Sequence, residues 1–264
     1  MTETKTSAAA GKSAAASSSA QADSVVVRAL EGVEEMSVGV QLQQAIWGYS
    51  AVDTVPEQMF VVAKESGGQV LAAFCGEEPV GFALAFAGIH HGAHYLHSHM
   101  VGILPEFQNR GVGRLLKLAQ RKDALARNIE LIEWTFDPLQ LRNAHFNIVR
   151  LGAIARRYIP NCYGRTTSPL HAGLPTDRLV AEWWVGSKRV REAVENVREV
   201  PQTAGRISLP ANVREICVND VPLAEDVQTR MREQFQEQFA AGRAAVGFEF
   251  GESQGSYLLE HYED

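Results

Sequence analysis

The feature that most constrains the fold is an apolar strand that leads into a glycine loop and then into a helix. The segment 94–104, HYLHSHMVGIL, has strand character, and residues 111–128, GVGRLLKLAQRKDALARN, place most apolar side chains on one helical side. Between them, Gly111 and Gly113 allow positive φ and a close approach of a ligand to the backbone. A helix start adds unpaired N–H groups and the positive end of its dipole. The segment predicts either a cradle for a pyrophosphate or only a tight turn.

The order of the elements around this loop indicates the fold class. A meander of strands leads into a strand–helix–strand unit, which predicts an α/β (α+β) domain with a mixed, mostly antiparallel central sheet flanked by helices. The strands are expected at residues 25–30, 69–75, 79–88, 94–104, 129–136 and 153–159. The helices are expected at residues 31–48, 56–66, 111–128 and 139–152, with glycines as stops at 48 and 152.

The rest of the chain suggests three parts. Residues 1–24 are a low-complexity tail that we expect to be disordered, residues 25–165 form the sheet domain, and residues 166–264 form a C-terminal α/β extension. In the extension, Val227, Met231, Phe235 and Phe239 make an apolar stripe on an expected helix at 223–242. We expect the stripe to wall an acceptor pocket, with an oligomer contact or a satellite core as alternatives.

Composition excludes several classes of protein. No apolar run reaches the roughly 18 residues of a membrane span, so we expect a soluble chain with no membrane partner. A net charge of -6 gives no sign of nucleic-acid binding. Cys75, Cys162 and Cys217 are odd in number, far apart and in no C-x-x-C spacing, which indicates reduced thiols and a cytoplasmic location.

The loop is neither a Walker nor a Rossmann motif, because no G-K-[ST] follows it and the G-x-G-x-x-G spacing is absent. The segment GILPEFQNRGVGRLL instead resembles the acetyl-CoA-binding motif of the GNAT acetyltransferase superfamily, in which a strand and x-V-x-P precede Q/R-x-x-G-x-G/A. The matching residues are Ile103, Pro105, Gln108, Gly111 and Gly113. The element order and FNIVRLGA also match, so the resemblance covers a little over half of the chain and implies a GNAT-like fold.

The resemblance implies a site for acetyl-CoA. Backbone groups of one strand would pair with the pantetheine arm, and backbone N–H groups of the loop would cradle the pyrophosphate. The implied cofactor-binding residues are Val101, Gly102, Ile103, Gln108, Asn109, Arg110, Gly111, Val112, Gly113 and Arg114, with Asn143 as a further candidate. Asp137 is expected to cap the turn at Pro138 rather than to act in the site.

His97 and His99 are the candidate catalytic residues. Side chains two apart on a strand share a face, and histidine titrates in the range needed to take a proton from an ammonium acceptor. The arylalkylamine N-acetyltransferases of the same superfamily carry a similar His-x-His on this strand, although a structural or solvent-facing role remains the alternative. His90, His91 and His94 fit no zinc pattern, so we expect no metal.

The predicted function is acyl transfer from acetyl-CoA to an amine, either a small molecule or a peptide, by direct attack in a ternary complex. One departure from the family matters: Ile148 stands where many members carry a tyrosine that acts as general acid. Either another group protonates the thiolate, with Tyr158 and Tyr163 as nearby candidates, or its protonation is unaided. The alternative is a GNAT-like module that binds acyl-CoA without turnover. A homo-oligomer is left open.

Overall fold

The computed structural model describes residues 25–50, 52–90, 92–164, 173–197 and 203–262. The expected tail at 1–24, His91, and the junction between the predicted sheet domain and extension at 165–172 lie outside these described residues. The chain divides into two compact units, one made of residues 1–86 and 100–120 and the other of residues 87–99 and 121–264.

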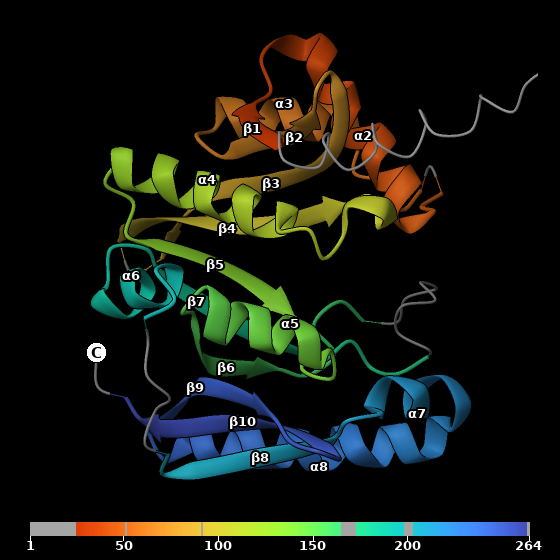
Figure 1. Ribbon diagram of the computed structural model, residues 1–264, viewed down its shortest axis with the longest axis vertical. Helices are drawn as coiled ribbons and strands as arrows, with labels where there is room; N and C mark the ends of the chain where they lie inside the picture. The colour runs from red at the N-terminus through yellow and green to blue at the C-terminus, as the bar shows by residue number, and fades with distance from the viewer. Residues whose placement is uncertain (1–24, 51, 91, 165–172, 198–202, 263–264) are drawn as a thin grey trace, which may run out of the picture. The chain divides into compact units, whose positions relative to one another are not determined.

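The elements largely follow the predicted order (Figure 1). The strands are β1 Val25–Ala29, β2 Gln69–Cys75, β3 Glu78–His90, β4 Ala93–Ile103, β5 Leu131–Phe136, β6 Ile154–Ile159, β7 Arg178–Trp184, β8 Gly205–Pro210, β9 Arg243–Phe250 and β10 Gln254–His261. The helices are α2 Gly32–Trp47, α3 Glu57–Glu65, η2 Pro105–Phe107, α4 Val112–Ala126, α5 Leu141–His145, η3 Phe146–Arg150, α6 Lys188–Val194, α7 Val213–Asn219 and α8 Val221–Ala240.

The mixed α/β class with mostly antiparallel pairing and flanking helices is confirmed. β4 and β5 pair in parallel. Antiparallel pairing is described for β1–β2, β2–β3, β5–β7, β6–β7, β6–β9, β9–β10 and β8–β10. The helix predicted at 139–152 is shorter and changes at Phe146 into a π-helical turn, and Gly152 ends it with φ 78°. β8 and α7 were not predicted from the sequence, because each is short and buries few side chains.

In the first unit, β2 shows why the sheet carries helices on both faces. After Gln69 its residues are apolar and alternate between the two faces, as expected for a strand with two covered sides. Val70 and Ala72 belong to the core formed with α2 and α3, which includes Phe60. Leu71 and Ala73 belong to the core on which Val112 and Leu116 of α4 pack.

In the second unit the strand order is β4–β5–β7–β6–β9–β10–β8. β7 follows residue 165 in the chain, yet it pairs on one side with β5 and on the other with β6. Trp183 of β7 is fully buried, packs edge-on against Trp134, and donates its indole N–H to the carbonyl of Leu151. The boundary at 165 remains a prediction, but β7 is an integral strand of this unit's sheet.

The apolar stripe of α8 packs within the same unit. Asp220 caps the helix by accepting a hydrogen bond from the N–H of Leu223, and the chain turns after it at Gly242, where φ is 72°. Phe235 is fully buried and stacks on Tyr158 of β6 at 5.7 Å between ring centroids, and it meets Tyr257 of β10 edge-on at 5.0 Å. Strands of this chain therefore cover at least the centre of the stripe.

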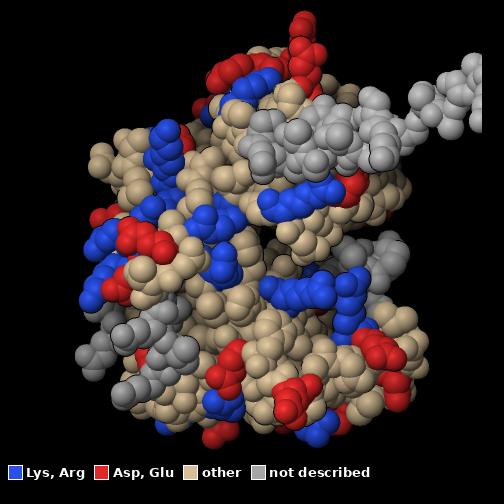
Figure 2. Space-filling model, in the orientation of Figure 1, with Lys and Arg blue, Asp and Glu red and all other residues tan. Residues whose placement is uncertain are grey.

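The surface mixes both signs of charge. On the face drawn in Figure 2, lysine and arginine are interspersed with aspartate and glutamate rather than gathered in one basic stripe. Among the residues that the structure describes, no helix is long and apolar enough to cross a membrane.

A buried carboxylate fastens α8 to the ends of β6 and β7. Asp177 has no exposed surface, and it accepts hydrogen bonds from the Tyr158 hydroxyl at 2.6 Å, the Arg232 Nε at 2.8 Å and the Asn161 N–H at 2.9 Å. A buried charge is tolerated only when it is paired and hydrogen-bonded, and these three donors meet that condition.

We expect Asp177→Ala to lower the free energy of unfolding by about 3 kcal/mol, because it leaves the Arg232 guanidinium and the Tyr158 hydroxyl without their acceptor. Urea unfolding followed by circular dichroism measures this change. Glu249→Gln is the control, since its partnership with Arg206 is exposed on both sides and its loss should cost under about 1 kcal/mol. Equal unfolding midpoints for Asp177→Ala and the wild type would contradict the assignment of Asp177 as a structural anchor.

Candidate functional site

The glycine loop is held in place by the end of β4 and the start of α4. After Ile103 the short helix η2 turns the chain, and the Gln108 side-chain amide donates a hydrogen bond to the carbonyl of Ile103 at 3.1 Å. The first intrahelical bond of α4 runs from the N–H of Leu115 to the carbonyl of Gly111 at 3.0 Å. The N–H groups of Val112 and Gly113 therefore precede the helical ladder and face the loop.

Gly111 has the conformation and the space that a cradle requires. Its φ is +83°, and a Cβ placed on it would meet no heavy atom within 4 Å. Asn109, two residues earlier, also has a positive φ, at 59°. Glycine is thus needed here for its backbone conformation, and the space in front of its backbone is open to a ligand. Together with the helix start, this geometry fits a pyrophosphate.

The other two glycines of the motif have packing roles. A Cβ on Gly113 would lie 3.3 Å from Cδ1 of Ile103, which is tight, so the missing side chain brings α4 close to β4. A Cβ on Gly102 would lie 2.9 Å from side-chain atoms of both Ile46 and Trp47 on α2. The loop residues from Gln108 to Gly111 are exposed, Val112 is buried, and Arg114 is half-buried.

The two candidate histidines share one face of β4, as predicted. Their ring centroids lie 6.2 Å apart, and the rings are tilted by 38°. His97 is half-buried and His99 is exposed. Leu96, which precedes His97, and Ser98, which lies between the two histidines, are buried on the other face. Protein atoms around His99 partly desolvate its ring and lower its pKa, which favours the neutral form that can accept a proton.

β5 brings further polar groups to the face that carries His97. The parallel ladder pairs Tyr95, Leu96 and His97 with Leu131, Ile132 and Glu133. Residues in register point to the same side of a sheet, so Glu133, and Thr135 two residues later, share the face of His97. Glu133 was not among the residues predicted for the site, although a glutamate inside the largely apolar strand LIEWTF was a usable signal.

The structure separates the candidates for a general acid. Ile148 is fully buried, so its position offers no group to the site. The Tyr158 hydroxyl is committed to Asp177, and burial together with that hydrogen bond raises its pKa far above the ordinary value. Tyr163 is exposed, and its hydroxyl lies 2.7 Å from Oγ1 of Thr135. Tyr163 is therefore the better placed of the two tyrosines.

The remaining predicted polar residues lie near the end of β5. Asp137 accepts a hydrogen bond from the N–H of Leu139 at 2.9 Å, as expected of a turn cap, and its burial raises its pKa. Asn143 is exposed on α5. No described contact links Asn143 to the residues of the loop, and its role remains a prediction.

The described residues contain no group of three His, Cys, Asp or Glu side chains that could hold a metal ion. His90 instead meets the ring of Tyr95 edge-on at 6.0 Å, and His91 lies outside the described part of the chain. The expectation that no metal is bound stays a prediction.

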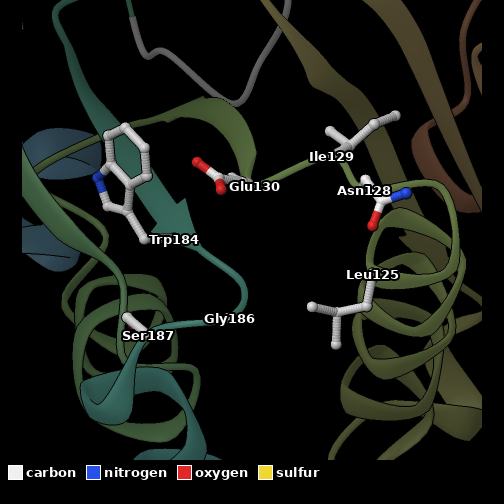
Figure 3. Close-up of a pocket in the computed structure, with 7 residues that line it drawn as sticks. All are labelled: Leu125, Asn128, Ile129, Glu130, Trp184, Gly186 and Ser187. Carbon is white, nitrogen blue, oxygen red and sulfur yellow. The ribbon is translucent and has the colours of Figure 1, made fainter.

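A pocket of about 390 Å³ lies at the start of β5, beside the end of β7 (Figure 3). Leu125, Ile129 and Trp184 supply apolar surface, and Glu130 lies beside Trp184 at its rim. The pocket is lined by Leu125, Asn128, Ile129, Glu130, Trp184, Gly186 and Ser187. None of the predicted site residues is among them.

Comparisons with known proteins agree with this geometry. Residues 40–149 match the model of the acetyltransferase (GNAT) family. A structure from Desulfovibrio desulfuricans, named as a GNAT-family acetyltransferase, aligns with 62% of this chain and 100% of its own at 14% identity and a TM-score of 0.50. The ribosomal-protein-S18-alanine N-acetyltransferase from Escherichia coli aligns with 62% of this chain and 96% of its own at 12% identity and a TM-score of 0.50.

No curated protein matches the sequence significantly. At these low identities the two solved structures speak for the fold alone, whereas the family match covers β4, the glycine loop, α4 and β5. Sequence match, fold and loop geometry agree, and together they support assigning residues 40–149 to the GNAT acetyltransferase superfamily.

Proposed function

We propose that this protein transfers an acetyl or another short acyl group from acyl-CoA to an amine, either a small molecule or a peptide. The observation that carries the proposal is the loop before α4. Gly111 has a positive φ with open space in front of it, and two N–H groups of the helix start precede the first intrahelical bond. Such a helix start is suited to binding a pyrophosphate. The match to the acetyltransferase family supports acyl-CoA as the molecule that carries this pyrophosphate.

The loop and β4 would bind acetyl-CoA along their backbones. Backbone N–H groups from Asn109 to Arg114 would hold the pyrophosphate, and Arg110 adds an exposed positive charge beside the loop. Backbone groups of Val101 to Ile103 would pair with the pantetheine arm. The bound molecule supplies an activated thioester.

His97 or His99 would prepare the acceptor. An amine is protonated at neutral pH and must lose a proton before its lone pair can attack the thioester carbonyl. The imidazole takes that proton, the N–C bond forms, and the C–S bond breaks. The departing thiolate then takes up a proton, for which Tyr163 is the candidate donor, since its hydroxyl is exposed and hydrogen-bonded to Thr135. The second proton that the nitrogen loses as it becomes an amide returns the tyrosinate to its neutral form.

A module that binds acyl-CoA without turnover is the second candidate, and the buried Ile148 at the usual tyrosine position is the observation that favours it. Release of CoA thiol in the presence of a panel of amino acids, polyamines, arylalkylamines and short peptides separates the two. Tight acetyl-CoA binding with no release above the hydrolysis background across the panel would favour the binding module.

We expect Gly111→Asp to abolish acetyl-CoA binding, because it places a side chain and a negative charge where the pyrophosphate would lie. Isothermal titration calorimetry measures the loss. Gly76→Asp is the matched control: Gly76 also has a positive φ, of 63°, with nothing within 4 Å of an added Cβ, but it lies in the turn between β2 and β3. The cofactor assignment fails if both variants bind acetyl-CoA as the wild type does.

Substituting the histidine that acts as base should lower kcat by about 10²-fold with little change in the KM for acetyl-CoA. The changes are His97→Gln and His99→Gln, and the control is His94→Gln, whose exposed side chain points to the opposite face of β4. The deficit should shrink as the pH approaches the pKa of the amine, because the free amine then needs no base.

The pH profile distinguishes the two histidines. A base must be neutral, and the pKa of His99 is lowered, so with His99 as base the rate should hold to a lower pH than an ordinary histidine would allow. Wild-type activity of the double variant at neutral pH would refute a base role for either histidine.

A further inference from the structure

A row of charged side chains crosses the sheet of the second unit on the face of His97. Glu133 of β5 is in register with Glu182 of β7, and both are almost fully buried. Arg157 of β6 forms an ion pair with Glu133, and its Nε lies 3.6 Å from Oε1 of Glu182. Arg156 pairs with the other oxygen of Glu182 at 2.7 Å. The row thus holds two buried carboxylates and two guanidinium groups.

His97 stands at the β4 end of this row. It is the register partner of Glu133 in the last pair of the parallel ladder, so their side chains leave adjacent strands, about 4.8 Å apart, on the same face. The register between the two strands is described as far as this pair. Glu133 is therefore the carboxylate that the sheet places beside His97.

A structural role alone does not account for the row. A buried ion pair contributes little net stability, because desolvating its charges offsets their attraction, and apolar residues in the same places often do as well. The opposite face of β5 carries Ile132, Trp134 and Phe136, which are apolar and buried as this rule leads one to expect. Burying ionised groups next to His97 therefore costs desolvation free energy. A chemical role for these groups would explain why they are present in spite of this cost.

We propose that Glu133 is a positioning residue for His97, orienting its imidazole and stabilising its protonated form. The proposal rests on the proposed acetyl transfer, in which His97 takes a proton from the acceptor ammonium. The N–H bond of the ammonium breaks, a new N–H bond forms on the imidazole, and the resulting positive charge lies beside the Glu133 carboxylate. A nearby opposite charge favours that charged form and strengthens the base.

The other described groups on this face include no second anion in register with His97. On β4, His99 lies 6.2 Å from His97 between ring centroids, and Tyr95 is in contact with His90. β3, the other neighbour of β4, carries no ionisable side chain between Glu78 and His90. On the side of Glu133 away from β4 lie Glu182 and Arg157, which carry charges of opposite sign. Among these described neighbours, Glu133 is the anion in register with His97.

The first test does not need turnover. NMR titration of the His97 ring in the full-length protein, compared between the wild type and Glu133→Gln, should show the His97 pKa falling by about half a unit or more. Glu182→Gln, the matched change one strand further away, should lower it less. Glu133→Gln is expected to fold because Arg157 keeps Glu182 as a partner and is partly exposed.

Arg157→Gln provides a variant of opposite sign. Removing the guanidinium that shares Glu133 should raise the His97 pKa, whereas disruption of packing would not produce opposite shifts in the two variants. An unchanged His97 pKa in Glu133→Gln overturns the proposal, and if that variant does not fold, an unchanged or lower pKa in Arg157→Gln does so.

The second test measures kinetics with an amine that the wild type acetylates. Glu133→Gln should lower kcat about 5- to 20-fold, with the KM for acetyl-CoA unchanged and the acidic limb of the pH profile moved to lower pH. In a His97→Gln background the same change should have no further effect, since Glu133 acts through His97. An equal fold-loss in both backgrounds overturns the proposal. If the wild type acetylates no amine, the proposed function fails, while the titration still decides whether Glu133 is coupled to His97.

Discussion

The short parallel ladder between β4 and β5 is the interaction on which the proposed chemistry depends. The register described for it runs from Tyr95 and Leu131 to His97 and Glu133. Two residues after His97, the same face of β4 carries His99, and the chain then leads into the glycine loop. A single strand therefore supplies the candidate base by its side chains and leads to the candidate phosphate cradle through its backbone.

The glycines of the loop show how one motif combines two physical demands. Gly111 is required for its backbone conformation and for open space. A Cβ on Gly102 would instead clash with neighbouring side chains, and a Cβ on Gly113 would make a tight contact with Ile103. A ligand needs the first property, and a rigid support for the ligand needs the second. The helix start can hold an anion only if α4 is fixed against β4, so packing and binding depend on each other here.

The second unit contains buried charged side chains in two places, and they have different consequences. Asp177 accepts hydrogen bonds from three donors, which lie on β6, in the following turn and on α8, and it therefore fastens α8 to the sheet. Because the Tyr158 hydroxyl donates its hydrogen bond to this carboxylate, Tyr158 is not a candidate for the general acid. The row from Glu133 to Arg156 is also paired, but one end stands beside a candidate base. Buried charges of the first kind hold elements together, and those of the second kind can tune a neighbouring side chain.

Local patterns in the sequence determined most of the elements. Alternating and helical periodicity located the strands and helices from Val25 to Ile159 and several beyond, Gly48 and Gly152 stopped helices where positive φ is needed, and the spacing from Ile103 to Gly113 identified the loop and the superfamily. The period of two along β4 also placed His97 and His99 on one face, because side-chain direction in a strand depends only on residue parity.

Tertiary structure alone decided which distant segments become neighbours. It inserted β7 between β5 and β6, paired the unpredicted β8 with β10, covered the centre of the α8 stripe with Tyr158 and Tyr257, and put Glu133 beside His97. It also distinguished Tyr163 from Tyr158, which look alike in the sequence. The physical reason is that strand order and register arise from long-range backbone pairing and shared burial, and no local periodicity encodes which strands will pair.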